Sequence, residues 1–69
     1  IVMDLPPVCK VAEEQIAAHG LTGRFSTATA DLFAGPYPPG ADVITLSWIL
    51  HDWSDESCRT ILRHCWNAL

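Results

Sequence analysis

The chain is short of basic side chains, with four lysines and arginines against eight acidic residues among 69. They are Lys10, Arg24, Arg59 and Arg63. Scattered in this way, they do not form the stripe of positive charge that neutralises nucleic-acid phosphates. The formal net charge of −4 is likewise unfavourable for binding a polyanion. We therefore expect no nucleic-acid partner.

Long apolar runs are also missing. The most apolar uncharged stretch, Val43 to Leu50, is far shorter than the roughly 20 residues that cross a bilayer. No basic start followed by an apolar segment suggests a signal peptide. We expect no membrane partner and a cytoplasmic location.

The three cysteines, Cys9, Cys58 and Cys65, are an odd number and include no Cys-x-x-Cys pair. A disulfide scaffold would leave one of them unpaired, and a zinc site would lack its usual ligand spacing. We expect reduced thiols and no bound metal. Without such crosslinks, a self-sufficient core of this size is marginal. The chain also begins at Ile1 without an initiator methionine and ends at Leu69 inside a helical pattern, which predicts a segment of a longer protein.

The patterns that are present alternate between strand and helix. Ile1 to Met3 is a short apolar run typical of the end of a buried strand, and Pro7 to His19 has apolar residues at helical spacing. The other predicted elements are a strand at Arg24–Thr29, a loop at Asp31–Gly40, a strand at Ala41–Leu46 and a helix at Asp55–Leu69. This order of strand, helix, strand, loop, strand and helix predicts an α/β fold with a parallel sheet.

Ligands of parallel sheets bind beyond the carboxyl ends of the strands, and this rule selects three places in the chain. Asp4 follows the first strand, Asp31–Phe33 the second and Ser47–Ser54 the third. Taken alone, Asp4 is equally consistent with two roles. Its carboxylate could bind a ribose diol, or it could cap the following helix. Asp31 fits a contact to an exocyclic amine, with Leu32 and Phe33 covering a flat ring, but by itself the pattern favours a polar turn.

The third of these segments carries the strongest chemical signal. His51 lies between Trp48 and Trp53 just after a predicted buried strand, where a neutral imidazole can act as a general base. The same pattern is typical of a core histidine packed against tryptophans, and by itself it favours that structural interpretation. Asp52 or Ser54 is expected to cap the final helix.

The other two histidines are predicted to be structural. His19 precedes Gly20, which stands where a left-handed C-cap is needed, and is expected to interact with the negative end of its helix. His64 is expected at the exposed edge of the last helix. The buried face of that helix is predicted to contain Cys58, Ile61, Leu62, Cys65 and Leu69.

Several segments together resemble the S-adenosylmethionine-dependent O-methyltransferases of the plant caffeic-acid and acetylserotonin type, a family with many bacterial members. The matching segments are Val2–Pro6 (VMDLP), Thr29–Phe33 (TADLF) and Ser47–Glu56 (SWILHDWSDE). Their order and spacing match across nearly all of the chain. The most specific element is HDWSDE after an apolar strand.

The resemblance implies a Rossmann-like class I methyltransferase domain, of which residues 1–69 are the partial S-adenosylmethionine-binding part. It implies that Asp4 binds the ribose hydroxyls of the cofactor and that Asp31 and Leu32 hold its adenine. Ser47 is expected to donate a hydrogen bond to the cofactor. His51 is implied to be the catalytic base that takes the proton from a hydroxyl of a small, aromatic acceptor. The resemblance further implies a homodimeric parent protein.

The chain departs from the family pattern at two positions. Ala30 stands where the family usually has glycine, which crowds the backbone near the adenine, and Ser47 stands where plant members often have lysine. The resemblance places the glycine-rich cofactor turn and the dimerisation region upstream of Ile1, and acidic partners of the base downstream of Leu69. We expect the isolated segment to be inactive.

Two alternatives to this function stay open from the residues. A nicotinamide-dinucleotide-binding oxidoreductase also has an acidic residue at the position of Asp4, although HDWSDE does not belong to that class. A truncated methyltransferase remnant with a binding or scaffold role is the other.

Overall fold

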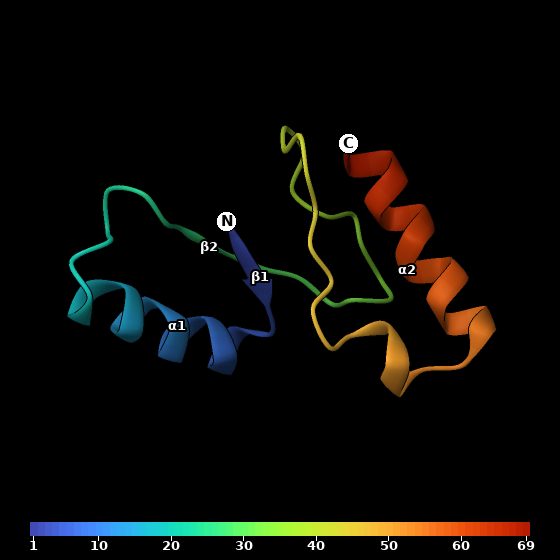
Figure 1. Ribbon diagram of the computed structural model, residues 1–69, viewed down its shortest axis with the longest axis horizontal. Coiled ribbons are helices and arrows are strands. Elements are labelled where there is room, and N and C mark those ends of the chain that lie inside the picture. The colour runs from blue at the N-terminus through green and yellow to red at the C-terminus, as the bar shows by residue number, and fades with distance from the viewer. The chain divides into compact units, whose positions relative to one another are not determined.

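The computed structural model describes residues 1–69 as two compact units, Ile1–Asp31 and Leu32–Leu69. The elements in chain order are β1 (Val2–Asp4), α1 (Pro6–Ala18), β2 (Thr27–Thr29), the 3-10 turn η1 (Leu50–Asp52) and α2 (Asp55–Ala68) (Figure 1). The first unit holds the two strands and α1, and the second holds a long loop, η1 and α2. Neither helix has the length and apolarity that crossing a bilayer requires.

The first unit is a β-α-β arrangement. β1 and β2 are parallel, with Val2 opposite Thr27 and Asp4 opposite Thr29. Cys9 on α1 is buried, and its thiol lies 3.3 Å from the Asp4 carbonyl oxygen and 3.4 Å from that of Ala28. This one side chain therefore contacts both strands. Parallel strands joined through a helix are the unit of α/β folds, so the predicted fold class is confirmed.

Local signals in the sequence set both ends of α1. Pro6 and Pro7 occupy its first turn, where a missing backbone N–H leaves no hydrogen bond unmade. At the other end Gly20 has a φ of +68°, and its N–H donates to the Ala17 carbonyl at 3.1 Å. The His19 ring donates from Nδ1 to the Gln15 carbonyl at 2.8 Å. The predicted glycine cap and the predicted role of His19 are both confirmed.

Two strand predictions need correction. The strand predicted at Ala41–Leu46 is absent, since the sheet has only β1 and β2 and these residues pair with no strand. A strand is held by the hydrogen bonds of its neighbour, and an apolar run does not supply that neighbour. The strand predicted at Arg24–Thr29 is limited to β2, because Arg24 and Phe25 both donate their backbone N–H groups to the Leu21 carbonyl in a turn.

The N-cap of α2 is Ser54, whose Oγ accepts a hydrogen bond from the Ser57 backbone N–H at 3.2 Å. Of the two candidates for this cap, Ser54 is therefore correct and Asp52 is not. Asp55 and Glu56 lie in the first turn, where their negative charge favours the positive end of the helix dipole.

The buried face of α2 differs in part from the prediction. Its buried side chains are Ile61, Cys65 and Ala68, whereas Leu62 and Leu69 are exposed. His64 belongs to this inner face, half-buried, and not to the exposed edge. The spacing 61, 64, 65 and 68 is that of a helix stripe, but it runs through a polar residue that a search for apolar side chains passes over.

We expect the Ser54→Ala substitution to lower the free energy of unfolding of the full-length protein by about 1 kcal/mol, because it removes the side-chain cap of α2. Ser57→Ala is the matched control, since it removes only the exposed hydroxyl that accepts from Ser54 Oγ at 3.1 Å and keeps the backbone N–H that the cap binds. Denaturant unfolding measures both variants. Equal losses from the two substitutions would contradict the assignment of the cap.

Burial raises the pKa of the Cys65 thiol above its ordinary value of 9.0, because desolvation disfavours the thiolate. The resulting stabilisation is present below the pKa of an unfolded cysteine and is lost as the pH rises through the raised value. We therefore expect alkylation of Cys65 by iodoacetamide to accelerate at higher pH in the folded protein than in the urea-denatured protein. Peptide mass spectrometry over a pH series measures this, and coincident profiles would contradict it.

Candidate functional site

Asp4 and Asp31 lie at the carboxyl edge of the two-stranded sheet. Asp4 is the last residue of β1 and lies opposite Thr29, the last residue of β2. The Ala30 N–H donates to the Asp4 carbonyl at 3.0 Å, and Asp31 is the next residue. The parallel register therefore brings two acidic residues that are distant in the sequence to one edge.

The carboxylate of Asp4 is exposed and locally oriented. Its Oδ1 accepts a hydrogen bond from the Leu5 backbone N–H at 2.8 Å. Leu5 is the N-cap of α1, and no side chain caps this helix, so the interpretation of Asp4 as the cap is wrong. A carboxylate at the end of a parallel strand is chemically suited to accept hydrogen bonds from the hydroxyls of a ribose.

Leu32 begins the second unit, and the loop that follows is tied to α2. Tyr37 is buried and its hydroxyl donates to the Leu32 carbonyl at 2.5 Å. His64 on α2 hydrogen-bonds through Nε2 to the Phe33 carbonyl at 3.0 Å. The sequence reasoning did not single out Tyr37 and placed His64 at the surface. The helix stripe through His64 was the signal for its place on the inner face of α2, but not for its partner in the loop.

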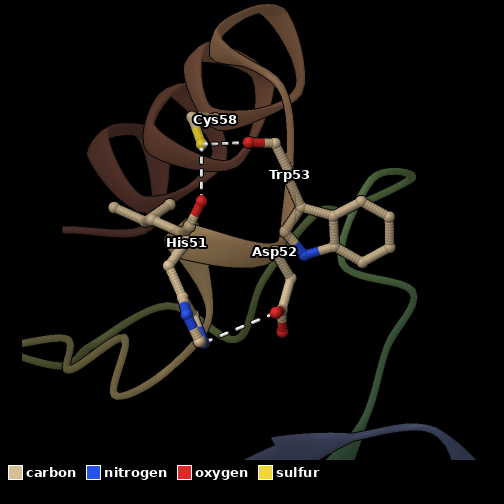
Figure 2. Close-up of polar contacts among 5 residues, drawn as sticks. His51, Asp52, Trp53 and Cys58 are labelled. Carbon is tan, nitrogen blue, oxygen red and sulfur yellow. Dashed lines mark hydrogen bonds and ion pairs between the residues drawn. The ribbon is translucent and has the colours of Figure 1, made fainter.

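His51 lies in the middle of η1 with its side chain 57% exposed (Figure 2). Its Nε2 is 3.4 Å from Oδ1 of Asp52. Its ring packs edge to face against that of Trp48, with a centroid distance of 5.5 Å. The interpretation of His51 as a core histidine is therefore wrong. The ring of Trp53 instead packs edge to face on Phe33, with a centroid distance of 4.7 Å.

The thiol of Cys58 holds η1 against the start of α2. Its Sγ lies 3.2 Å from the Leu50 carbonyl oxygen and 3.8 Å from that of Trp53 (Figure 2). These two carbonyls lie on either side of His51 and Asp52 in the sequence. The sequence predicted Cys58 only as a small core residue. In the structure its thiol also bonds the backbone carbonyls that flank His51 and Asp52.

The segment before His51 turns sharply. Ser47 is exposed at the start of this turn, and Trp48 has a φ of +59°. A left-handed backbone costs an L-residue roughly 1–2 kcal/mol, and such strained residues cluster at functional sites. An open cavity of about 340 Å³ follows the turn. It is lined by Leu46, Trp48, Ile49, Leu50 and His51.

A β-α-β unit with carboxylates at its carboxyl edge, and a separate turn that presents an exposed histidine, indicates the class of nucleoside-cofactor-binding α/β enzymes. Comparison with known proteins narrows this class. The O-methyltransferase domain family matches residues 1–69, and the chain belongs to this family of S-adenosylmethionine-dependent enzymes. The predicted family and the predicted cofactor are thereby confirmed.

The chain is also similar to individual proteins, one named as an O-methyltransferase and one as a hydroxylase. The chain is 56% identical over 68 residues to 3-hydroxy-5-methyl-1-naphthoate 3-O-methyltransferase of Streptomyces sahachiroi, a match that covers 99% of this chain and 20% of that protein. It is 47% identical over 58 residues to aclacinomycin 10-hydroxylase RdmB of Streptomyces purpurascens, covering 84% of this chain and 15% of the relative.

A solved structure also matches. It is the apo form of the S-adenosylmethionine-dependent methyltransferase SibL, with a TM-score of 0.95 and 38% identity over 99% of this chain and 20% of that one. The Rossmann-like assignment is confirmed by this likeness. The chain spans about one fifth of the length of SibL and of the naphthoate methyltransferase.

Proposed function

We propose that the full-length protein carrying these residues transfers the methyl group of S-adenosylmethionine to a hydroxyl of a small, aromatic acceptor, with His51 as the general base. The observation that carries this proposal is the exposed imidazole of His51 on η1, in a chain of the O-methyltransferase family. A catalytic base must reach its substrate, and a side chain that is 57% exposed is accessible to one.

The residues at the sheet edge fit the cofactor by their chemistry. Asp4 presents an oriented carboxylate that can accept hydrogen bonds from the ribose hydroxyls. Asp31, at the same edge, is proposed to accept from the adenine amine, and Leu32 to cover the ring. Ser47 is proposed to donate a hydrogen bond to the cofactor from the turn before His51.

The chain's part in the reaction is to supply a base and an apolar surface. S-adenosylmethionine supplies an electrophilic methyl group on a positively charged sulfur. A phenol has a pKa near 10 and is mostly neutral at pH 7, so its oxygen becomes a better nucleophile when His51 takes the proton. Asp52 stabilises the resulting imidazolium only weakly, since both side chains are more than half exposed.

The cavity beside His51 supports the aromatic class of acceptor. Four of its five lining residues are apolar, and the Trp48 ring lies next to the imidazole. Aromatic side chains favour stacked or edge-to-face contacts with other rings. The naphthoate substrate of the Streptomyces sahachiroi relative belongs to the same chemical class.

Transfer of a radiolabelled methyl group from S-adenosylmethionine to hydroxylated aromatic compounds by the full-length protein tests the proposal. The matched control is each acceptor with its hydroxyl already methylated. We expect labelled product only from the free hydroxyl. Binding of S-adenosylmethionine without transfer to any acceptor would favour the non-catalytic remnant, and binding of NAD in its place would favour the oxidoreductase.

Hydroxylation of an aromatic acceptor is a second candidate, favoured by the 47% identity to aclacinomycin 10-hydroxylase. This reaction requires an oxidant such as molecular oxygen and a source of electrons. Mass spectrometry of the product distinguishes an added methyl group from an added oxygen atom.

The proposed homodimer of the parent protein is tested separately by light scattering of the full-length protein.

We expect the Cys58→Ala substitution to lower kcat about threefold, because the thiol no longer anchors the Leu50 carbonyl next to His51. The affinity for S-adenosylhomocysteine is expected to stay unchanged. Cys58→Ser is the matched control, since its hydroxyl can donate to the same carbonyl, and we expect it to retain most of kcat. Steady-state kinetics measures both variants. Equal losses in kcat would show that the donor does not matter.

A further inference from the structure

We propose that Tyr37 and His64 are positioning residues that fix the backbone of Leu32 and Phe33 in the conformation that receives the adenine ring. The inference rests on the proposed function, which assigns Leu32 to the adenine. All four residues belong to the second unit, Leu32–Leu69. Neither Tyr37 nor His64 is thereby a catalytic residue, because each acts on the backbone of another residue.

Two side chains bind two successive carbonyl groups of this loop. The Tyr37 hydroxyl donates to the Leu32 carbonyl at 2.5 Å, and His64 donates from Nε2 to the Phe33 carbonyl at 3.0 Å. Because a carbonyl oxygen only accepts, the imidazole must carry its hydrogen on Nε2. Residues 30–36 contain no helix or strand, so side-chain bonds of this kind have a large part in fixing the backbone there.

The two side chains also form one packed unit. The rings of Tyr37 and His64 lie 5.2 Å apart, and Tyr37 is only 5% exposed. His64 is anchored through α2, whose buried residues Ile61 and Cys65 lie on the same helix face. The bond from His64 therefore ties the loop to a helix, whereas the bond from Tyr37 lies within the loop and its ring packs against that of His64.

Gly35 shows how closely the loop passes the imidazole. Its φ is +48°, and a Cβ added there would lie 2.3 Å from Nδ1 of His64. The loop thus follows the outline of the His64 ring at a position that only glycine accommodates. A binding loop that is already ordered loses less entropy when its ligand arrives. We therefore expect Tyr37 and His64 to determine the affinity for adenosine ligands and not the rate of methyl transfer.

The test compares Tyr37→Phe, His64→Leu and His64→Gln in the full-length protein. Calorimetry gives the Kd of S-adenosylhomocysteine and of adenosine, and kinetics gives kcat at saturating S-adenosylmethionine. We expect Tyr37→Phe and His64→Leu each to weaken both ligands about fivefold with kcat unchanged. His64→Gln is expected to restore most of the affinity, because its amide can donate to the Phe33 carbonyl.

His19→Leu is the matched control, since it removes a similar bond from a histidine to a carbonyl, 2.8 Å long, in the first unit. We expect it to leave both affinities unchanged. Wild-type affinity in Tyr37→Phe, or a loss confined to S-adenosylhomocysteine and absent for adenosine, would overturn the inference. If His64→Leu does not fold, Tyr37→Phe decides alone. Failure of the wild-type protein to bind S-adenosylhomocysteine would instead overturn the proposed function.

Discussion

Replacing His51 by alanine in the full-length protein is expected to lower kcat for methyl transfer by a factor of about 10² to 10⁴, the contribution of a positioned general base. The imidazole is exposed on η1 and interacts with the neighbouring Trp48 and Asp52 side chains. Its removal is therefore expected to leave the fold and the Kd of S-adenosylhomocysteine nearly unchanged. Steady-state kinetics and calorimetry measure the two quantities.

Two further variants serve as controls for His51→Ala. Asp52→Ala removes a partner that is 63% exposed, and we expect kcat to fall by about twofold or less, as for a solvent-screened pair. His19→Ala alters a histidine in the first unit and is expected to have no effect on kcat. Full activity of His51→Ala would contradict its role as the base. Loss of cofactor binding would indicate that His51 has a binding role.

Replacing Asp4 by alanine is expected to raise the Kd of S-adenosylmethionine about 10-fold to 100-fold, since hydrogen bonds to a charged group contribute roughly 1.5–3 kcal/mol. The structural reason is the exposed carboxylate at the end of β1, whose Oδ1 is oriented by the Leu5 N–H. We expect kcat at saturating cofactor to change little. Calorimetric titration of the full-length protein measures the affinity.

Asp42→Ala is the matched control for Asp4→Ala, because Asp42 is an exposed aspartate outside the proposed site. It removes the same charge and is expected to leave the Kd unchanged. Asp4→Asn keeps one acceptor oxygen without the charge, so we expect an intermediate Kd. An unchanged Kd in Asp4→Ala, or an equal effect from Asp42→Ala, would contradict the ribose-binding role.

The helices could be predicted from the sequence because their ends depend on local chemistry. The prolines at residues 6 and 7, Gly20 and Ser54 act within one or two turns of the helix that they begin or end. The predicted helix Pro7–His19 differs from α1 by one residue at each end, and the predicted helix at Asp55–Leu69 extends one residue beyond α2. Such signals need no knowledge of the rest of the fold.

The strand predicted at Ala41–Leu46 failed because pairing is not local. Its apolar character describes a preference for burial, yet Val43 is 75% exposed and the segment has no partner strand. The contact of His64 with the loop was missed for a related reason. The sequence around His64 does not indicate which carbonyl its ring binds, because that carbonyl belongs to Phe33, 31 residues away.

The sequence proposed residues for the candidate site but gave little of their geometry. The carboxyl-end rule selected Asp4 and Asp31, and the parallel register of β1 and β2 explains why they share one edge. The pattern around His51 did not distinguish a core histidine from an accessible one. Exposure of the side chain depends on η1 and on the Cys58 thiol that holds it, neither of which the sequence pattern describes.

A crystal structure of the full-length protein with S-adenosylhomocysteine tests the central claim most directly. We predict that the ribose hydroxyls lie within hydrogen-bond distance of the Asp4 carboxylate and that Leu32 contacts the adenine. The His51 imidazole should face the sulfur across the space that the acceptor occupies. A ribose bound away from Asp4, with His51 directed away from the sulfur, would contradict the account.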